Sequence, residues 1–215
     1  LSRLDRRGVF EAALREERAE AGRVQAVRGG LGQLGQSAKH PLELRPAEER
    51  EAVVEGFEPG DPGEWDGAYR GQIALLKDGG LYKMWYSGGG SSGPWQTGYA
   101  TSADGFDWEI YAGNPVLAAG PPGSWDETEA DGPTVIKDGT GYKMWYHGCN
   151  ADYSVCSIGY ATSADGLTWT PYWKNPVMER LAGDWLFASP VVAEGATYRM
   201  WYDQWNGDFD QVSYA

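Results

Sequence analysis

The chain has 215 residues, 41% of them hydrophobic, and a formal net charge of −13. This length suits one sizeable domain. The acidic balance excludes nucleic acid as the main partner, because binding to phosphates needs a basic face. No apolar run approaches the roughly 20 residues that a membrane-spanning helix needs, and the opening residues, LSRLDRRGVF, contain no apolar signal core. We therefore expect no membrane partner.

Residues 1–56 differ in composition from the rest of the chain. They hold ten basic and ten acidic residues, so the whole net charge of −13 falls on residues 57–215. Hydrophobic residues at helical spacing among Ala, Glu and Arg predict a helix that ends at Gly29-Gly30. The later stretch PAEEREAVVEG is compatible with a helix or a strand. We expect residues 1–56 to be a linker, a cap or the tail of another domain.

From residue 57 onwards the chain is internally repetitive. The octapeptide GYATSADG occurs at 98–105 and again at 159–166, and repeats of this kind decide the architecture of a chain. Strand-like runs such as PTVIKD, YKMWYH and SIGYATS alternate with Asp-Gly and Gly-rich turn signals. Two series of tryptophans recur at spacings of 60 and 60, and of 60 and 56: Trp65, Trp125 and Trp185, then Trp85, Trp145 and Trp201.

Four antiparallel strands per unit, repeated along a chain, are typical of propeller blades. We therefore predict an all-β fold: a β-propeller of four-stranded blades, about two and a half of them present, preceded by an N-terminal helical or irregular segment. The predicted blades are 57–117, 118–178 and an incomplete 179–215. GYAT is then the third strand of a blade and SADG the turn into the fourth, with Trp108 and Trp169 packed between blades.

The predicted number of blades is too small for a closed ring. Propellers close with about four to eight blades, and open strand edges pair readily with other strands. Three explanations are open. The chain is a fragment of a five-bladed protein, with the missing blades elsewhere in a longer chain; or residues 1–56 cover an edge, for instance with a strand at 52–56; or two copies close the ring as a homodimer.

The only two cysteines, Cys149 and Cys156, flank a predicted hairpin loop. They are placed to form a cross-strand disulfide or to remain as two free thiols. A disulfide would imply an oxidising compartment, extracellular or periplasmic.

The succession KDG, YKMWYSGG, IGYATSADG, NPVL and PGSWD resembles the five-bladed propellers of carbohydrate-active enzymes, the furanosidase-type superfamily around glycoside hydrolase families 43, 32 and 130. The resemblance covers residues 57–215. In these families catalytic carboxylates project from the innermost strands into a central pocket, and one motif is Glu-Gly-Pro, whose Glu is the general acid. Asp131-Gly132-Pro133 is similar to that motif, with Asp in place of Glu. The equivalent positions of the other units are Gly71 and, by alignment, Ala188.

The resemblance implies cleavage of a glycosidic bond by carboxylate acid–base catalysis, with Asp131 as the acid and Glu129 beside it. Two residues apart on one strand, they share a face and lie roughly 6.6 Å apart, near the separation used by inverting glycosidases. Both approach from the same side, however, and the alternative is that they are solvated charges at a strand start. Because Gly71 and Ala188 carry no carboxylate, a non-catalytic glycan- or protein-binding propeller is the second interpretation.

Further candidates would bind an oligo- or polysaccharide. His147 and Asp203 each follow a recurring MWY tryptophan by two residues, as Ser87 does. An imidazole there could bind a sugar hydroxyl, carry a proton or hold an ion. The other candidates for substrate binding are a cation and three aromatic residues: Arg70, Trp95, Tyr153 and Trp205. No metal-ligand spacing, phosphate loop or dinucleotide fingerprint is present, so we predict no metal and no cofactor.

Overall fold

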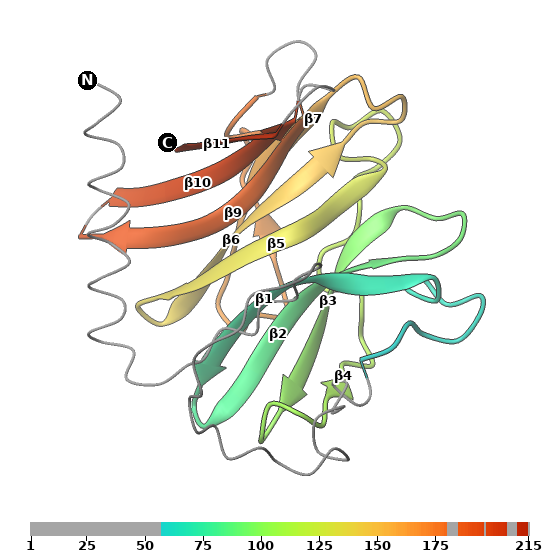
Figure 1. Cartoon of the computed structure of the whole chain (residues 1–215), viewed down its shortest axis with the longest axis vertical. Helices are drawn as coiled ribbons and strands as arrows, with labels where there is room; N and C mark the ends of the chain where they lie inside the picture. Colours follow the sequence, from blue (N-terminus) through green and yellow to red (C-terminus); the bar gives the residue numbers. More distant parts are fainter. Residues whose placement is uncertain (1–56, 180–184, 196, 206–209, 215) are drawn as a thin grey trace, which may run out of the picture. The chain divides into compact units, whose positions relative to one another are not determined.

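The computed structural model describes residues 57–179, 185–195, 197–205 and 210–214 (Figure 1). The helix predicted in residues 1–56 and the strand considered at 52–56 lie outside these residues. The described part is built from β-strands, which confirms the all-β class. None of its segments forms a helix long and apolar enough to cross a membrane.

The strands form two four-stranded antiparallel groups and a third group of three. The first group consists of β1 (Tyr69–Asp78), β2 (Leu81–Gly89), β3 (Trp95–Ser102) and β4 (Glu109–Ile110). The second consists of β5 (Glu129–Asp138), β6 (Gly141–Cys149), β7 (Cys156–Ser163) and β8 (Thr170–Pro171). The third consists of β9 (Trp185–Glu194), β10 (Thr197–Trp205) and β11 (Asp210–Tyr214).

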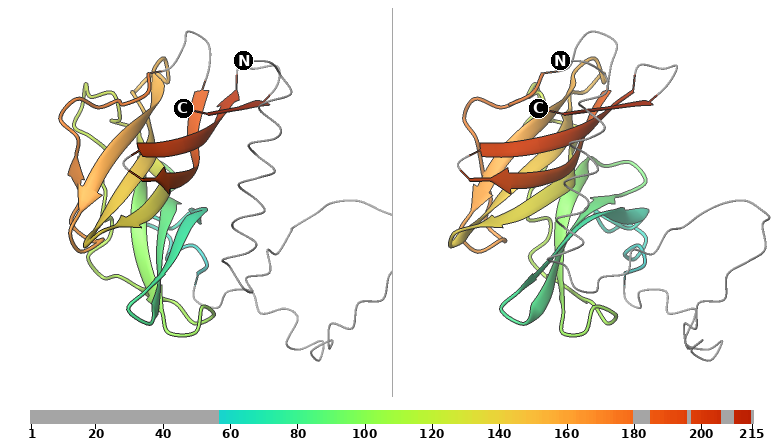
Figure 2. Two further views of the ribbon diagram at one scale, coloured as in Figure 1. Left: turned by 90° about the vertical axis from the view of Figure 1, so that its left-hand side faces the viewer. Right: turned by 60° about the vertical axis from the view of Figure 1, so that its left-hand side comes forward.

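The groups follow one another in chain order. A short parallel pairing, Trp95 with Glu129 and Gln96 with Ala130, joins β3 to β5 and makes the first two groups one sheet of eight strands. The third group is a separate sheet in the order β11-β10-β9. β9 runs beside β5 and β6 in both sets of views (Figures 1 and 2), and side chains pack across this junction.

The repeated octapeptide has the structural role that the sequence predicts. Its first half ends β3 or β7, and its second half is the turn after that strand. In the first copy, Ser102 Oγ accepts a hydrogen bond from the Gly105 N–H at 2.8 Å, and Asp104 Oδ1 accepts one from the Phe106 N–H at 2.9 Å. The second copy repeats each of these bonds. The side chains therefore hold the turn by bonding their own backbone.

The core consists of large apolar side chains between neighbouring groups. The cluster between the first and second groups includes Trp85, Tyr99, Leu117, Val135, Tyr142, Met144 and Trp169. The cluster between the second and third groups includes Trp145, Ile158, Leu186, Val191 and Met200. Trp169 thus packs between two groups, as predicted, whereas Trp108 packs with Met84, Tyr86 and Ala100 of its own group.

Each of the leading strands β1, β5 and β9 contains a β-bulge. In β5 the register shifts between Asp131 and Thr134, and in β1 between Gly71 and Ala74. In β9 the shift falls opposite Trp201. Bulges bend a strand and redirect its side chains, and they are frequent next to active sites. Here they fix how three consecutive groups present side chains to one pocket.

Candidate functional site

β5 positions both predicted catalytic carboxyl groups. Asp131 lies directly opposite His147 of β6, and Glu129 opposite Cys149. The bulge after Asp131 begins at Gly132, whose φ of +56° lies in the left-handed region that glycine adopts without strain. The sequence Asp-Gly-Pro therefore places a carboxyl group immediately before a sharp change in strand direction.

Asp131 is buried, with 6% of its surface exposed. Burial raises the pKa of its carboxyl to about 6, mainly because the charged form loses its hydration. Nearby His147 lowers the pKa, Glu129 raises it and a hydrogen bond from Ser87 lowers it again. The alternative that these are solvated charges is therefore wrong for Asp131. At mildly acidic pH the group holds a proton that it can donate.

His147 is held at both ring nitrogens and is 2% exposed. Its Nδ1 lies 2.6 Å from the backbone carbonyl oxygen of Leu186, and its Nε2 lies 3.0 Å from Glu129 Oε2. A carbonyl oxygen can only accept, so Nδ1 donates to Leu186 and Nε2 faces the carboxyl group of Glu129.

Aromatic rings from the third group cover one side of the imidazole. The Phe187 ring stacks on it with centroids 4.5 Å apart and an interplanar angle of 22°. The Trp185 ring lies 6.5 Å from the imidazole and stacks on Tyr153 at 5.7 Å and 11°. Flat apolar surfaces thus adjoin charged and polar groups, an arrangement that suits a ligand with both kinds of face.

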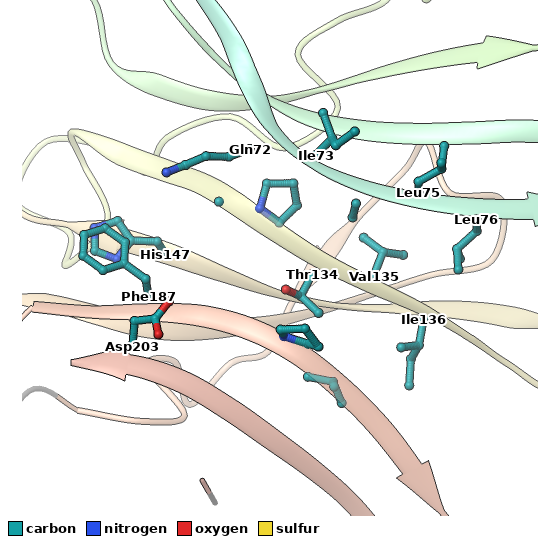
Figure 3. Close-up of a pocket in the computed structure, with 15 residues that line it drawn as sticks. Gln72, Ile73, Leu75, Leu76, Thr134, Val135, Ile136, His147, Phe187 and Asp203 are labelled. Atoms are coloured by element: carbon teal, nitrogen blue, oxygen red, sulfur yellow. The ribbon is translucent and has the colours of Figure 1, made fainter. Parts of the chain in front are cut away.

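An open pocket of about 880 Å³ lies over this region, with Phe187, His147 and Asp203 grouped at one end (Figure 3). Ile73, Leu75 and Leu76 of β1 line its other end. The complete lining is Gln72, Ile73, Ala74, Leu75, Leu76, Gly132, Pro133, Thr134, Val135, Ile136, His147, Phe187, Pro190, Val191 and Asp203. Neither Asp131 nor Glu129 belongs to this lining.

Ser87 connects the bulges of β1 and β5. Its Oγ lies 3.1 Å from Gln72 Oε1 and accepts a hydrogen bond from the Gly132 N–H at 2.8 Å. Gln72 has a φ of +45°, which is strained for a residue with a side chain. Backbone strain of this kind persists where the surroundings enforce it, often at binding sites. Gln72 was not among the predicted site residues, whereas Ser87 was considered as a polar candidate because it shares the repeat position of His147 and Asp203.

The structure separates the predicted binding residues. Asp203 lines the pocket, whereas Tyr153 is not in its lining and stacks on Trp185. Arg70 is instead committed to the fold, because its Nε donates to Asp66 Oδ2 at 2.6 Å and its guanidinium to the Glu58 carbonyl at 2.7 Å. Trp95 lies outside the pocket lining and packs edge-on against Tyr69. The side chain of Trp205, the last candidate, is not among those that the structure describes.

The strand register corrects the alignment of the third unit. His147 pairs with Asp131, and its repeat counterpart Asp203 pairs with Phe187. Phe187, and not Ala188, therefore occupies the position of Asp131. The alignment was displaced because the bulge in β9 is shifted by one residue relative to that in β5.

Trp185 is likewise not equivalent to Trp125. It is the first residue of β9, where it occupies the register position of Glu129. The spacing of 60 residues between Trp125 and Trp185 therefore does not mark a repeated structural position.

Cys149 and Cys156 form a disulfide between β6 and β7, at directly opposite positions. This settles the choice left open by the sequence in favour of the bridge. Cys149 Sγ lies 3.1 Å from His147 Nε2, so the bridge borders the site.

No protein-family model matches the chain. Two uncharacterized proteins of Mycobacterium tuberculosis, one from each of two strains, are each 32% identical to it over 120 residues. The match covers 52% of this chain, and the chain spans only 37% of the length of these curated relatives.

Solved glycoside hydrolases share the fold. One, described only as a glycoside hydrolase, matches with a TM-score of 0.58 at 23% identity over 74% of this chain and 56% of its own. A thermostable family-43 glycoside hydrolase gives 0.52 at 23% identity over 66% and 53%. The β-1,2-mannobiose phosphorylase of Listeria innocua, in complex with β-1,2-mannobiose, gives 0.53 at 21% identity over 63% and 41%. The predicted resemblance to the furanosidase-type propeller superfamily is confirmed in its fold, while the number of blades stays a prediction.

Proposed function

We propose that this chain is part of a carbohydrate-active propeller of glycoside hydrolase type, in which Asp131 is the general acid. The observation that carries the proposal is the position of Asp131, a buried carboxyl group before the bulge of a leading strand, beside His147 and Glu129. Its pKa of about 6 suits an acid that must hold a proton near neutral pH.

The chemistry assigned to this site is protonation of the glycosidic oxygen as the bond to the sugar breaks. Asp131 supplies that proton. The neighbouring imidazole favours the carboxylate form of Asp131, and Glu129 favours its protonated form. Hydrolysis also needs a carboxylate on the opposite side of the sugar. Asp203, which lines the pocket from β10, is the candidate for contact with the sugar from that group.

Substrate binding is assigned to the mixed surface above the imidazole. Sugar rings have apolar C–H faces, and Phe187 offers an aromatic face beside the pocket. Gln72 and Asp203 provide polar groups for hydroxyls. These features support an oligo- or polysaccharide as ligand.

A non-catalytic glycan- or protein-binding domain is the second candidate function. It is favoured by the strand register, which puts Gly71 and Phe187 at the positions equivalent to Asp131. Of the three leading strands that the structure describes, only β5 therefore carries a carboxyl group at the register position of Asp131.

The test is turnover of chromogenic furanosides and pyranosides by the chain and, in parallel, by the complete product of its gene. Asp131→Asn should abolish turnover and leave the circular dichroism spectrum unchanged, whereas the matched variant of an exposed carboxylate, Glu109→Gln, should keep full activity. Unchanged turnover in Asp131→Asn would remove Asp131 from its role. Glycan binding without turnover in the wild-type protein would select the second function.

A further inference from the structure

Four groups of the kinds that ligate transition metals converge beside the pocket. His147 Nε2 lies 3.0 Å from Glu129 Oε2 and 3.1 Å from Cys149 Sγ. The ligand atoms of His147, Cys149 and Cys156 all lie within 4.8 Å of one another. Both cysteines are fully buried, His147 is 2% exposed and the Glu129 side chain 14%.

The imidazole is oriented as a ligand would be. Its Nδ1 donates to the Leu186 carbonyl at 2.6 Å, and metal-binding histidines almost always donate their other N–H to such an acceptor. This contact directs Nε2 at the carboxylate of Glu129 and the sulfur of Cys149. All three atoms bear lone pairs that can ligate a cation.

We propose that reduction of the Cys149–Cys156 disulfide converts this cluster into a Zn²⁺ site, with the two thiolates, His147 Nε2 and Glu129 Oε2 as its four ligands. Two sulfurs, one nitrogen and one oxygen match the donor types of tetrahedral zinc, while Ca²⁺ and Mg²⁺ prefer oxygen ligands alone. The site stands apart from the proposed glycosidase function, because it depends only on the donor set and its burial.

Atoms and electrons balance in this conversion. A phosphine reductant gives two electrons to the S–S bond, takes an oxygen atom from water and leaves as the phosphine oxide, while the two protons of that water protonate the sulfurs. Zn²⁺ then displaces the two thiol protons, and the lone pair of Nε2 binds it directly. Because it releases these protons, zinc binding should weaken as the pH falls.

The experiment uses the whole chain, reduced with a phosphine in low denaturant under nitrogen and returned to buffer, with two thiols per chain counted by a chromogenic disulfide. Titration with Co²⁺ should give one ion per chain, with a thiolate-to-cobalt band in the near ultraviolet and the strong visible bands of tetrahedral cobalt. Zn²⁺ should bleach both. The oxidised chain should show neither band.

Variants locate the site. His147→Gln keeps both thiols and should weaken Co²⁺ binding at least about tenfold, and Glu129→Gln should do the same. The matched control is His40→Gln, which changes the only other histidine in the sequence and should leave the affinity unchanged. The proposal is overturned if the reduced chain, with two counted thiols, binds no Co²⁺, or if His147→Gln and wild type bind it equally.

Discussion

Asp131 of β5 lies directly opposite His147 of β6, and the two are buried together. The imidazole partly offsets the loss of hydration, but burial dominates and the pKa of Asp131 stands at about 6 instead of its usual 3.8. A carboxyl group in this state destabilises the fold when it ionises. An ionised Asp131 therefore lowers the free energy of unfolding.

Replacing Asp131 by Asn should stabilise the chain at neutral pH. Between pH 3.8 and about 6 the folded chain binds more protons at this group than the unfolded chain does, so stability falls as the pH rises through that window. Above it the ionised carboxylate costs about 3 kcal/mol. Asp131→Asn removes this cost, so its urea midpoint should exceed that of wild type at pH 7.5 and lose most of that advantage at pH 4.

The control for this prediction is Glu109→Gln, which neutralises an exposed carboxylate on β4. It should shift the midpoint little at either pH. An Asp131→Asn variant whose stability relative to wild type does not change between pH 4 and pH 7.5 would contradict the raised pKa.

Gly98→Ala should destabilise the chain, although it adds one methyl group. A Cβ at Gly98 would lie 2.7 Å from Cε1 and from Cε2 of the Tyr86 ring. That ring cannot easily move, since its hydroxyl is bonded to Asp66 at 2.9 Å and to Asn114 at 3.0 Å. We expect a loss of about 1–3 kcal/mol in the free energy of unfolding. Gly93→Ala is the matched control.

A Cβ at Gly93 would meet no atom within 4 Å. Gly93→Ala should therefore stay within about 0.5 kcal/mol of wild type in the same urea titration. Equal effects of the two substitutions would show that the contact between Gly98 and Tyr86 does not constrain the first group.

The repeat was predictable because its side chains act locally. The side chains of Ser102 and Asp104 accept hydrogen bonds from backbone N–H groups three and two residues away. Eight consecutive residues are therefore sufficient to specify the end of a strand and the turn that follows it. Trp169 was also predictable, since a large apolar residue that recurs at the spacing of the unit is buried by the neighbouring unit.

The site was only partly predictable. Asp131 and His147 were found from a motif and a repeat position, but their contacts join residues far apart in the chain. Phe187 was missed because the bulge in β9 is shifted by one residue, and no sequence pattern specifies which residue of a strand bulges. The convergence of Glu129 with Cys149 was hidden for a related reason: cross-strand neighbours depend on register and not on ligand spacing.

Acid should weaken the turn of the second octapeptide. The N–H groups of Leu167 and Thr168 donate to Asp165 Oδ1 at 2.8 and 2.7 Å, and these bonds lower the pKa of its carboxyl to about 2. Since the folded pKa lies below the unfolded one, this stabilisation is complete above pH 4 and is lost as the pH falls towards 2. Asp165→Asn should reduce the slope of unfolding free energy against pH in that window, measured by urea titration at successive pH values.

Phe187 should contribute to glycan affinity through its exposed face above the imidazole. It lines the pocket while its other face stacks on His147 at 4.5 Å. Phe187→Ala should therefore weaken binding of a glycan ligand by about 1–2 kcal/mol, measured by calorimetry on the same protein that is used for turnover.

The matched control is Phe106→Ala, which removes an equally large ring that is 51% exposed in the first SADG turn, outside the pocket lining. It should leave the affinity unchanged. If both variants unfold at the wild-type temperature and bind equally well, Phe187 is not a ligand contact, and the pocket beside His147 is not where the sugar lies.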